Sequence, residues 1–370
     1  MSAPAGASRL RPAALPDFPW DRLVPYASTA RAHRDGIVDL SVGTPVDPTP
    51  QVVQEALAAA ADAPGYPMTA GSPELRAAVV AWLARRFGVR DLDPAAVLPV
   101  IGTKELVAWL PTLLGASSVG YPGLAYPTYD VGARIAGAAG RSVDALSALG
   151  PDRVDLLWIN SPSNPTGKVL PPAHLRKVVD WCRERGTVLA SDECYADLWY
   201  DGDAPASVLS PDVCGGSHDG LLAVHSLSKR SNLAGYRAGF VAGDPVLVAR
   251  LLEVRKHAGM IVPAPVQAAM VAALSDDAHV VDQRGRYAAR RAVLHGALTG
   301  AGFTIDASEG GLYLWATRAE PCYDTVAWLA ARGILVAPGD FYGPGGAQHV
   351  RVALTATDER IAAAADRLTA

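Results

Sequence analysis

Residues 221–243, LLAVHSLSKRSNLAGYRAGFVAG, contain two short apolar runs that are separated by a polar loop. Three more apolar runs of this kind precede them: AVLPVIG at 96–102, DLLWINSP at 155–162 and TVLASDECY at 187–195. Helical patterns, such as LRKVVDWCRERG at 175–186, lie between the runs. Alternating strands and helices are typical of a mostly parallel sheet with helices on both faces, so the sequence predicts an α/β fold.

The pattern changes near residue 278, where a long Arg- and Ala-rich helical stretch begins. It is followed by GGLYLWAT, ILVAPGDFYG and HVRVALT, which predict a smaller α+β unit. The proline-rich N-terminal residues predict an extended, turn-rich arm, which we expect to lie with this smaller unit. We therefore predict an arm at 1–45, a large domain at 46–277 and a small domain at 278–370.

Local signals predict two helices early in the large domain. The stretch QVVQEALAAAAD, from residue 51, has helical spacing of its apolar residues. In the next helical stretch, ELRAAVVAWLARRFG, Ser72 and Gly88 mark the expected start and end.

Composition excludes several classes of protein. The chain has 370 residues, of which 50% are hydrophobic and 19% charged, with a net charge of −4. This is an ordinary globular composition with no bulk attraction for nucleic acid or an anionic membrane. Because we find neither a signal-peptide pattern nor an apolar run long enough to span a bilayer, we expect a cytoplasmic protein. The 4 cysteines lack C-x-x-C spacing and the 8 histidines form no H-E-x-x-H motif, so no metal site is predicted.

The loop within 221–243 carries a lysine in a suggestive setting. Lys229 follows an apolar strand, is flanked by Ser226 and Ser228, and precedes Arg237 by eight positions. A lysine amine can condense with an aldehyde, while hydroxyls and a guanidinium hold a phosphate. The segment therefore suits a cofactor that carries both groups, although a solvated Lys–Arg loop explains it equally well on its own.

Three more segments place polar residues at the ends of predicted strands or the start of a helix. Asp192, in DECY, lies where open α/β sheets bind ligands, and its carboxylate could pair with a protonated pyridine nitrogen. Tyr195 could reach a ring hydroxyl. The motif NPTG at 164–167 fits a tight turn, and GTKE at 102–105 opens a predicted helix whose N–H groups suit a phosphate. A capping aspartate, a turn and a helix cap are the simpler interpretations of these three segments.

Taken together, the segments resemble the fold-type I pyridoxal-phosphate aminotransferases. The motifs GTK, Y-P-x-Y, NPTG, D-x-x-Y, S-x-S-K, R and a late R-V-A occur in the family's order along most of the chain. The resemblance implies a large domain with a mostly parallel seven-stranded sheet covered by helices, plus a smaller α+β domain. It also implies pyridoxal 5′-phosphate as the cofactor, amino acids and 2-oxo acids as substrates, and a homodimer with shared active sites.

The resemblance assigns roles to individual residues. Lys229 is implied as the Schiff-base lysine that also shuttles a proton, and Asp192 as the partner of the pyridinium nitrogen. Asn164 and Tyr195 would hold the ring hydroxyl, with Asn164 also near the substrate, and Tyr126 would stack on the ring. The residues implied for the phosphate are Thr103, Lys104, Ser226 and Arg237. For Lys104 the resemblance leaves open whether the side chain or only the backbone N–H contributes.

Substrate contacts are implied in the same way. Arg351, in HVRVAL, matches the arginine that grips the substrate α-carboxylate, and Gly43, in SVGTP, matches the loop that closes over substrate. Tyr66, in GYPMTAG, resembles a tyrosine that reaches the phosphate of the neighbouring subunit. No motif selects the group that recognises the distal end of the substrate. The available candidates are Arg34, Arg255, Arg284, Arg286 and Tyr313.

Within the family, LPDFPWDRL, GIVDLSVGTPVDPTP and ASEGGLYLW most resemble the actinobacterial type of N-succinyl-LL-diaminopimelate aminotransferase. That likeness implies glutamate as amino donor in lysine and diaminopimelate biosynthesis. Aminotransferases of the aspartate, alanine or aromatic type remain alternatives, as does a pyridoxal-phosphate lyase or decarboxylase on the same fold. A serine hydrolase is disfavoured, because Ser217, His218 and Asp219 are neighbours in sequence and no G-x-S-x-G elbow occurs.

Overall fold

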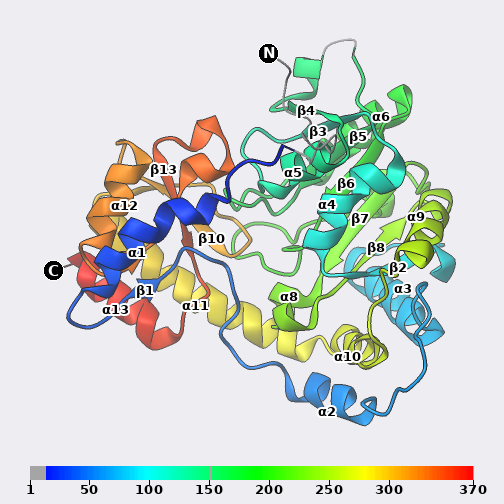
Figure 1. Cartoon of the computed structure of the whole chain (residues 1–370), viewed down its shortest axis with the longest axis horizontal. Coiled ribbons are helices and arrows are strands. Elements are labelled where there is room, and N and C mark those ends of the chain that lie inside the picture. The colour runs from blue at the N-terminus through cyan, green and yellow to red at the C-terminus, as the bar shows by residue number, and fades with distance from the viewer. Residues whose placement is uncertain (1–13, 150–151, 370) are drawn as a thin grey trace, which may run out of the picture.

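The computed structural model describes residues 14–149 and 152–369 (Figure 1). Its main feature is a seven-stranded sheet with the order β2-β8-β7-β6-β5-β3-β4. The strands are β2 (Val97–Ile101), β8 (Ala238–Gly243), β7 (Leu221–Ser226), β6 (Val188–Asp192), β5 (Leu156–Asn160), β3 (Ser118–Tyr121) and β4 (Ala139–Ser142). Strand β8 runs antiparallel to both neighbours, whereas the other pairs are parallel. The predicted mostly parallel sheet is confirmed.

Helices cover both faces of this sheet, because its strands are apolar on both sides. In β5, Leu157 and Ile159 pack into one buried cluster and Leu156 and Trp158 into another. The first cluster includes residues of α2 (Gln51–Ala59), α3 (Pro73–Phe87), α6 (Pro172–Arg185), α7 (Pro211–Cys214) and α10 (Ala264–Ser275). The second includes residues of α4 (Thr103–Leu114), α5 (Thr128–Ile135) and α9 (Pro245–Ala258).

Helix caps behave as the sequence predicts. Ser72 accepts a hydrogen bond from the Leu75 N–H at the start of α3, and Gly88 ends this helix with φ 66°. The predicted helix from residue 51 is confirmed as α2. Strands β3 and β4 were not predicted. All four residues of β4 are exposed, and a strand that buries no side chains needs no apolar pattern in its sequence.

A second sheet, with the order β12-β13-β10-β9, contains antiparallel strand pairs throughout. These strands are β12 (Ala337–Pro338), β13 (His349–Ala353), β10 (Tyr313–Thr317) and β9 (Thr304–Asp306). The accompanying helices are α1 (Val24–Arg31), α11 (Ala278–Gly300), α12 (Cys322–Ala330) and α13 (Asp358–Thr369). The predicted smaller α+β unit is confirmed, and the boundary near residue 277 remains our proposal.

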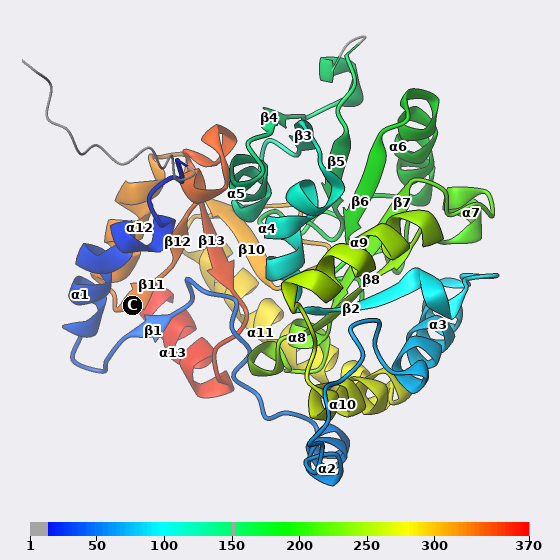
Figure 2. The same cartoon turned by 45° about the vertical axis from the view of Figure 1, so that its right-hand side comes forward.

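The N-terminal segment lies beside the C-terminal elements. Strand β1 (Val38–Asp39) pairs in parallel with β11 (Ile334–Leu335), and Figures 1 and 2 show the blue N-terminal ribbon alongside the orange and red elements. The first 13 residues of the predicted arm lie outside the described residues. No helix in the described ranges is long and apolar enough to cross a membrane. Within the same ranges, no three His, Cys, Asp or Glu side chains form a potential metal cluster.

A buried ion pair ties this N-terminal segment to α11. Asp47 accepts hydrogen bonds from both terminal nitrogens of Arg290, at 2.7 and 2.6 Å, and one from Gln283 at 2.8 Å. Burial raises the pKa of Asp47, but the bonds from Arg290 and Gln283 outweigh this effect and lower it overall. The stability from this pair is therefore complete above about pH 4 and is lost as pH falls through the lowered pKa.

Replacing Asp47 by Asn should destabilise the protein by about 3 kcal/mol, because the buried Arg290 charge would then face an amide. Asp358→Asn is the matched control, since Asp358 also contacts Arg290, at 2.7 Å, but its side chain is 81% exposed. We expect the control to cost less than about 1 kcal/mol in urea unfolding of the cofactor-free protein. Equal losses for the two variants would contradict the importance of the buried pair.

Candidate active site

Three parallel strands end at one cavity of about 790 Å³. The last residues of β5, β6 and β7 (Asn160, Asp192 and Ser226) all line it. The second sheet contributes Tyr313 from β10 and Arg351 from β13. Because open α/β sheets bind ligands at the carboxyl ends of their strands, this cavity is the candidate active site.

Almost every predicted site residue lines this cavity. They are Gly43, Thr103, Lys104, Tyr126, Asn164, Asp192, Tyr195, Ser226, Lys229, Arg237 and Arg351. Tyr66 does not line the cavity, and its side chain is fully exposed. The structure therefore brings together residues from positions 43 to 351, and it leaves Tyr66 on the surface.

One end of the cavity forms a cradle for an anion. Gly102 precedes α4 with φ 75°, and a Cβ atom at this position would overlap the Arg237 guanidinium. The N-terminus of α4, with Thr103 as its first residue, adds backbone N–H groups and the positive end of the helix dipole. Ser226, which also lines the cavity, supplies a hydroxyl. These groups fit a phosphate.

The carboxylate of Asp192 is buried in the cavity wall. Its Oδ2 accepts a hydrogen bond from the Tyr129 hydroxyl at 2.8 Å, and its Oδ1 accepts one from the Cys194 backbone N–H at 3.2 Å. Burial raises the pKa of Asp192 above its ordinary value, because the charged form loses water. In the described part of the chain, no Lys, Arg or His side chain makes an ion pair with it. A protonated pyridine nitrogen would supply the missing positive charge.

Lys229 lies in the short helix α8 (Leu227–Arg230) and points into the same cavity, where its amine donates to the Gly43 carbonyl. Burial lowers the pKa of the Lys229 amine, because the ammonium form loses water. The neutral form of the Lys229 amine is therefore more populated than in a solvent-exposed lysine, and a nucleophile or base requires this form.

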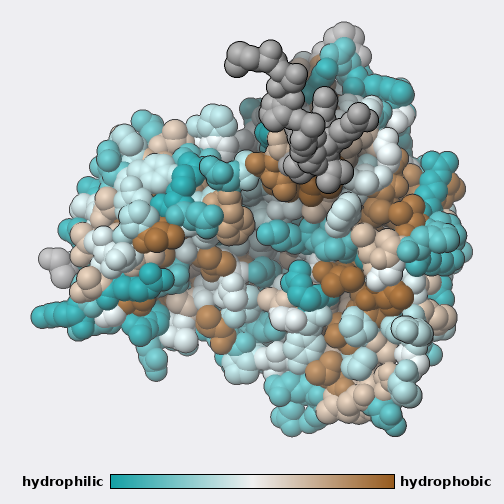
Figure 3. All heavy atoms as spheres, in the orientation of Figure 1, coloured by the Kyte–Doolittle hydropathy of each residue, from teal (hydrophilic) through white to brown (hydrophobic). Residues whose placement is uncertain are grey.

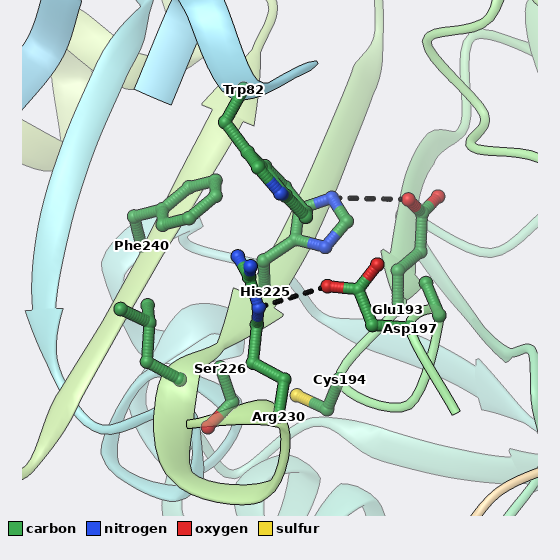
Figure 4. Close-up of a pocket in the computed structure, with 10 residues that line it drawn as sticks. Trp82, Glu193, Cys194, Asp197, His225, Ser226, Arg230 and Phe240 are labelled. Atoms are coloured by element: carbon green, nitrogen blue, oxygen red, sulfur yellow. Dashed lines mark ion pairs between the residues drawn. The ribbon is translucent and has the colours of Figure 1, made fainter. Parts of the chain in front are cut away.

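Two buried ion pairs fix the turn that carries Ser226 and Lys229 (Figure 4). His225 Nε2 lies 3.1 Å from Glu193 Oε2, and Arg230 Nε lies 2.9 Å from Asp197 Oδ2. The Arg230 guanidinium also lies 4.9 Å from the centroid of the Trp82 ring, which packs in the same cluster. His225 and Arg230, on either side of this turn, are thus both held by residues of the chain just after β6.

Arg351 is 3% exposed and is oriented by two hydrogen bonds. Its Nη1 donates to Asn164 Oδ1 at 2.9 Å and its Nη2 to the Ser41 carbonyl at 2.8 Å. The guanidinium also lies 3.8 Å from the centroid of the Tyr313 ring. Arg351 Nε is buried and has no hydrogen-bond partner among the described residues. This arrangement leaves part of the guanidinium available for a carboxylate.

The sequence analysis missed or left unassigned three residues of this site. Asn160 is the register partner of Asp192, and its side chain donates to the Asp192 carbonyl at 2.8 Å. Tyr129, the second tyrosine of AYPTY, contacts the Asp192 carboxylate. Tyr313 was only one of several candidates for the distal end, yet its hydroxyl lies 3.4 Å from that of Tyr195. The rule that selected Asp192, a polar residue at a strand end, also selects Asn160.

A phosphate cradle, a buried carboxylate without a cation and a lysine with a lowered pKa define a pyridoxal-phosphate-dependent enzyme of the aminotransferase fold. The chain belongs to the family described as aminotransferase class I and II, whose model matches residues 35–368. Pyridoxal phosphate is the cofactor of this family and fold, and the residues present fit it.

Two relatives are similar along nearly the whole chain. A protein of Mycobacterium tuberculosis named "Probable aminotransferase Rv1178" is 69% identical over 96% of this chain and 86% of its own length. The 4-dedimethylamino-4-oxo-anhydrotetracycline transaminase OxyQ of Streptomyces rimosus is 64% identical, over 96% of this chain and 99% of its own.

Solved structures show the same fold. An aminotransferase from Mycobacterium tuberculosis superposes with a TM-score of 0.87 at 26% identity, covering 98% of both chains. A protein from Thermus thermophilus, described as a probable N-succinyldiaminopimelate aminotransferase, has a TM-score of 0.86 at 29% identity. That match covers 95% of this chain and 99% of the other.

Replacing Gly102 by Ala should weaken pyridoxal phosphate binding to the apoenzyme by about tenfold or more, because the added Cβ displaces Arg237 and loses a charge-assisted bond. Gly115→Ala, at the other end of α4, is the control for a positive φ, although Gly115 is left-handed helical (ψ 30°) and Gly102 is not (ψ 148°). Gly115 has a similar φ of 67°, but a Cβ there meets nothing within 4 Å. The control should lose stability but keep cofactor affinity. Equal affinity losses would show that the effect is not specific to the cradle.

Proposed function

We propose that the protein transfers the amino group of glutamate to N-succinyl-2-amino-6-ketopimelate, as an N-succinyl-LL-diaminopimelate:2-oxoglutarate aminotransferase of lysine biosynthesis. The observation that carries this proposal is a further cation, Lys104, in the cavity that also holds Arg351, besides Arg237 at the phosphate cradle and Lys229. An acceptor with carboxylates at both ends needs two such groups. The name of the Thermus thermophilus protein agrees with this substrate class.

Transamination requires a proton to leave Cα of the bound amino acid. Pyridoxal phosphate, when bound, supplies the electron sink that stabilises the charge left on Cα. Lys229 is the proposed base, because it lines the cavity and its burial lowers the pKa of the amine, which favours the neutral form that a base requires. After glutamate has given up its amino group, the acceptor binds in its place, and Lys229 returns a proton to Cα in this second half of a ping-pong reaction.

The α-carboxylate of each substrate is proposed to bind Arg351. A carboxylate can take the unpaired Nε without breaking the two bonds that orient the guanidinium. Because the Arg351 guanidinium would bind the α-carboxylate of the amino donor and of the amino acceptor alike, it cannot by itself distinguish one 2-oxo acid from another. Discrimination must come from the rest of the cavity wall.

Lys104 is the proposed partner of the distal carboxylate. Its Nζ lies 5.9 Å from the centroid of the Phe18 ring, so the side chain is directed toward the N-terminal segment that forms one wall of the cavity. Arg237 already lies against Gly102 at the phosphate cradle. Lys104 would therefore hold the phosphate through its backbone and the substrate through its side chain.

A second candidate function follows from the 64% identity to OxyQ, whose name specifies a polycyclic ketone as acceptor. The cavity wall includes apolar side chains that could cover such a ring system, among them Leu15, Phe18, Trp20, Val107 and Val131. This candidate places the acceptor against the apolar wall, so it predicts that acceptor binding depends less on the charge of Lys104.

Acceptor profiling with glutamate as donor tests the proposal. We expect kcat/KM for N-succinyl-2-amino-6-ketopimelate to exceed that for oxaloacetate, pyruvate, an aromatic 2-oxo acid and the polycyclic ketone. In Lys104→Met, KM for the preferred acceptor should rise about tenfold, as expected for the loss of one charge-assisted hydrogen bond. Lys177→Met, which changes an exposed lysine of α6, is the control and should behave as wild type.

The possible outcomes separate the alternatives. If Lys104→Met weakens pyridoxal phosphate binding and leaves KM unchanged, the Lys104 side chain serves the phosphate instead. If the polycyclic ketone or oxaloacetate is preferred, the pathway proposal is wrong, while the aminotransferase assignment stands. A reaction that proceeds without any 2-oxo acid would instead indicate a lyase or decarboxylase.

We also propose a homodimer with shared active sites. The Tyr66 side chain is fully exposed, although the sequence motif around it resembles one that serves a neighbouring subunit. Further apolar side chains are exposed on α4 and α9, namely Trp109, Val246 and Val254. Figure 3 shows hydrophobic patches on the part of the surface that carries these helices. Such a surface suits burial against a second copy of the chain.

Mixed dimers test this arrangement. Tyr66→Ala and Lys229→Ala homodimers should each be nearly inactive, and they should regain partial activity when unfolded together and refolded. Recovery is expected because each mixed dimer contains one site with both residues intact. If mixed dimers form without any recovery, Tyr66 acts within its own chain.

A further inference from the structure

Tyr129 is a buried tyrosine that contacts the Asp192 carboxylate. Its side chain is 0% exposed, and its hydroxyl donates to Asp192 Oδ2 at 2.8 Å. The other hydrogen bond to this carboxylate comes from the Cys194 backbone N–H. Both donors are neutral. They stabilise the negative charge of Asp192 without cancelling it.

The fold fixes this hydroxyl from several directions. Tyr129 lies in the first turn of α5, and its ring stacks on Trp158 of β5 with a centroid distance of 5.1 Å and an interplanar angle of 25°. The Tyr126 ring meets it edge-on at 6.0 Å. Helix α5 can approach α4 closely because Gly132 packs against the Val107 carbonyl, where a Cβ would lie only 2.7 Å from that oxygen.

The charges around Asp192 explain why a neutral donor is needed. Burial raises the pKa of the Asp192 carboxyl and so favours its neutral form, whereas hydrogen bonds from Cys194 and Tyr129 act in the opposite direction. The other titratable groups that face it include the Cys194 thiol, the His225 imidazole and the Tyr126 phenol. Burial also raises the pKa of Tyr129 well above its ordinary value, so the phenol remains a donor. An arginine or lysine here would pair with Asp192 and compete with the pyridine nitrogen.

We propose that Tyr129 is a positioning residue for the cofactor: its hydroxyl keeps Asp192 ionised and aimed, and thereby keeps the pyridine nitrogen of pyridoxal phosphate protonated. This inference rests on the proposed role of Asp192. Tyr129 reaches the cofactor through Asp192 and acts on the electron sink, so it should affect the chemical step and cofactor retention. It should not affect recognition of the substrate carboxylates, which other residues bind.

Tyr129→Phe removes the hydroxyl and keeps the stacked ring. We expect the apoenzyme to bind pyridoxal phosphate about tenfold more weakly and kcat to fall by a similar factor, the scale of one lost hydrogen bond to a charged group. KM for glutamate should change less than twofold. The near-ultraviolet and visible absorbance of the lysine-bound cofactor should shift as the ring nitrogen loses its proton. Thermal unfolding of the apoenzyme reports separately on stability.

Tyr121→Phe is the matched control. Tyr121 also donates to an aspartate at 2.8 Å, but its partner Asp130 does not line the cavity, whereas Asp192 does. The Tyr121→Phe variant should leave the cofactor affinity, the absorbance of the bound cofactor and kcat unchanged. If Tyr129→Phe alters only the thermal unfolding of the apoenzyme, as a purely structural residue would, the inference is wrong.

Asp192→Asn separates this inference from the proposal on which it rests. If Asp192→Asn itself leaves cofactor affinity and kcat unchanged, the role of Asp192 is wrong. If Asp192→Asn is impaired but Tyr129→Phe is not, only the inference about Tyr129 fails. In the Asp192→Asn background, Tyr129→Phe should have little further effect, because both changes remove the same interaction. Full additivity of the two losses would overturn the inference.

Discussion

The active site depends on an anion that is buried at the end of a strand without a cation of its own. A carboxylate at such a position is unfavourable unless hydrogen bonds and an opposite charge compensate the lost water. In this protein the backbone N–H of Cys194 and the hydroxyl of Tyr129 provide the hydrogen bonds to Asp192. The opposite charge is left for the cofactor ring. The strand that carries Asp192 is central in the sheet, so its position is fixed from both sides by β5 and β7.

The remaining charges of the cavity are arranged around this anion. Arg237 lies at the phosphate cradle, Arg351 is held near the second sheet, and Lys104 is directed toward the N-terminal segment. None of these cations makes an ion pair with Asp192 in the described part of the chain. Each is therefore available to a different anionic part of the ligands, and Asp192 would be left to pair with the pyridine nitrogen of a bound cofactor. Because Arg237, Arg351 and Lys104 are kept apart from Asp192, the cavity can offer separate charged groups to separate parts of its ligands.

The sequence was sufficient for the features that depend on neighbouring residues. Five of the seven main strands are marked by apolar runs, and Lys229 and Asp192 directly follow or end such runs. It was insufficient where a role depends on a distant partner. Tyr129 and Asp192 are 63 positions apart and meet only because α5 packs across β5. Strand β4 has no apolar pattern, since it is an exposed edge strand whose pairing with β3 depends on the position of that neighbour. The roles of individual site residues remain predictions from family likeness, although nearly all of these residues line the cavity.

Arg351, the proposed partner of the substrate carboxylate, depends on the arrangement of the two sheets. It lies on β13 of the second sheet, yet its two hydrogen bonds go to Asn164, after β5 of the large sheet, and to the Ser41 carbonyl of the N-terminal segment. The same segment continues to Gly43, which accepts from Lys229, and to Asp47, which pairs with Arg290 of α11. A guanidinium in the proper orientation therefore exists only when the N-terminal segment and both sheets are assembled. A carboxylate that binds the free Nε would strengthen this assembly, because it favours the arrangement in which the guanidinium is already oriented. The proposed recognition of the substrate carboxylate and the assembly of the N-terminal segment with both sheets thus depend on one set of contacts.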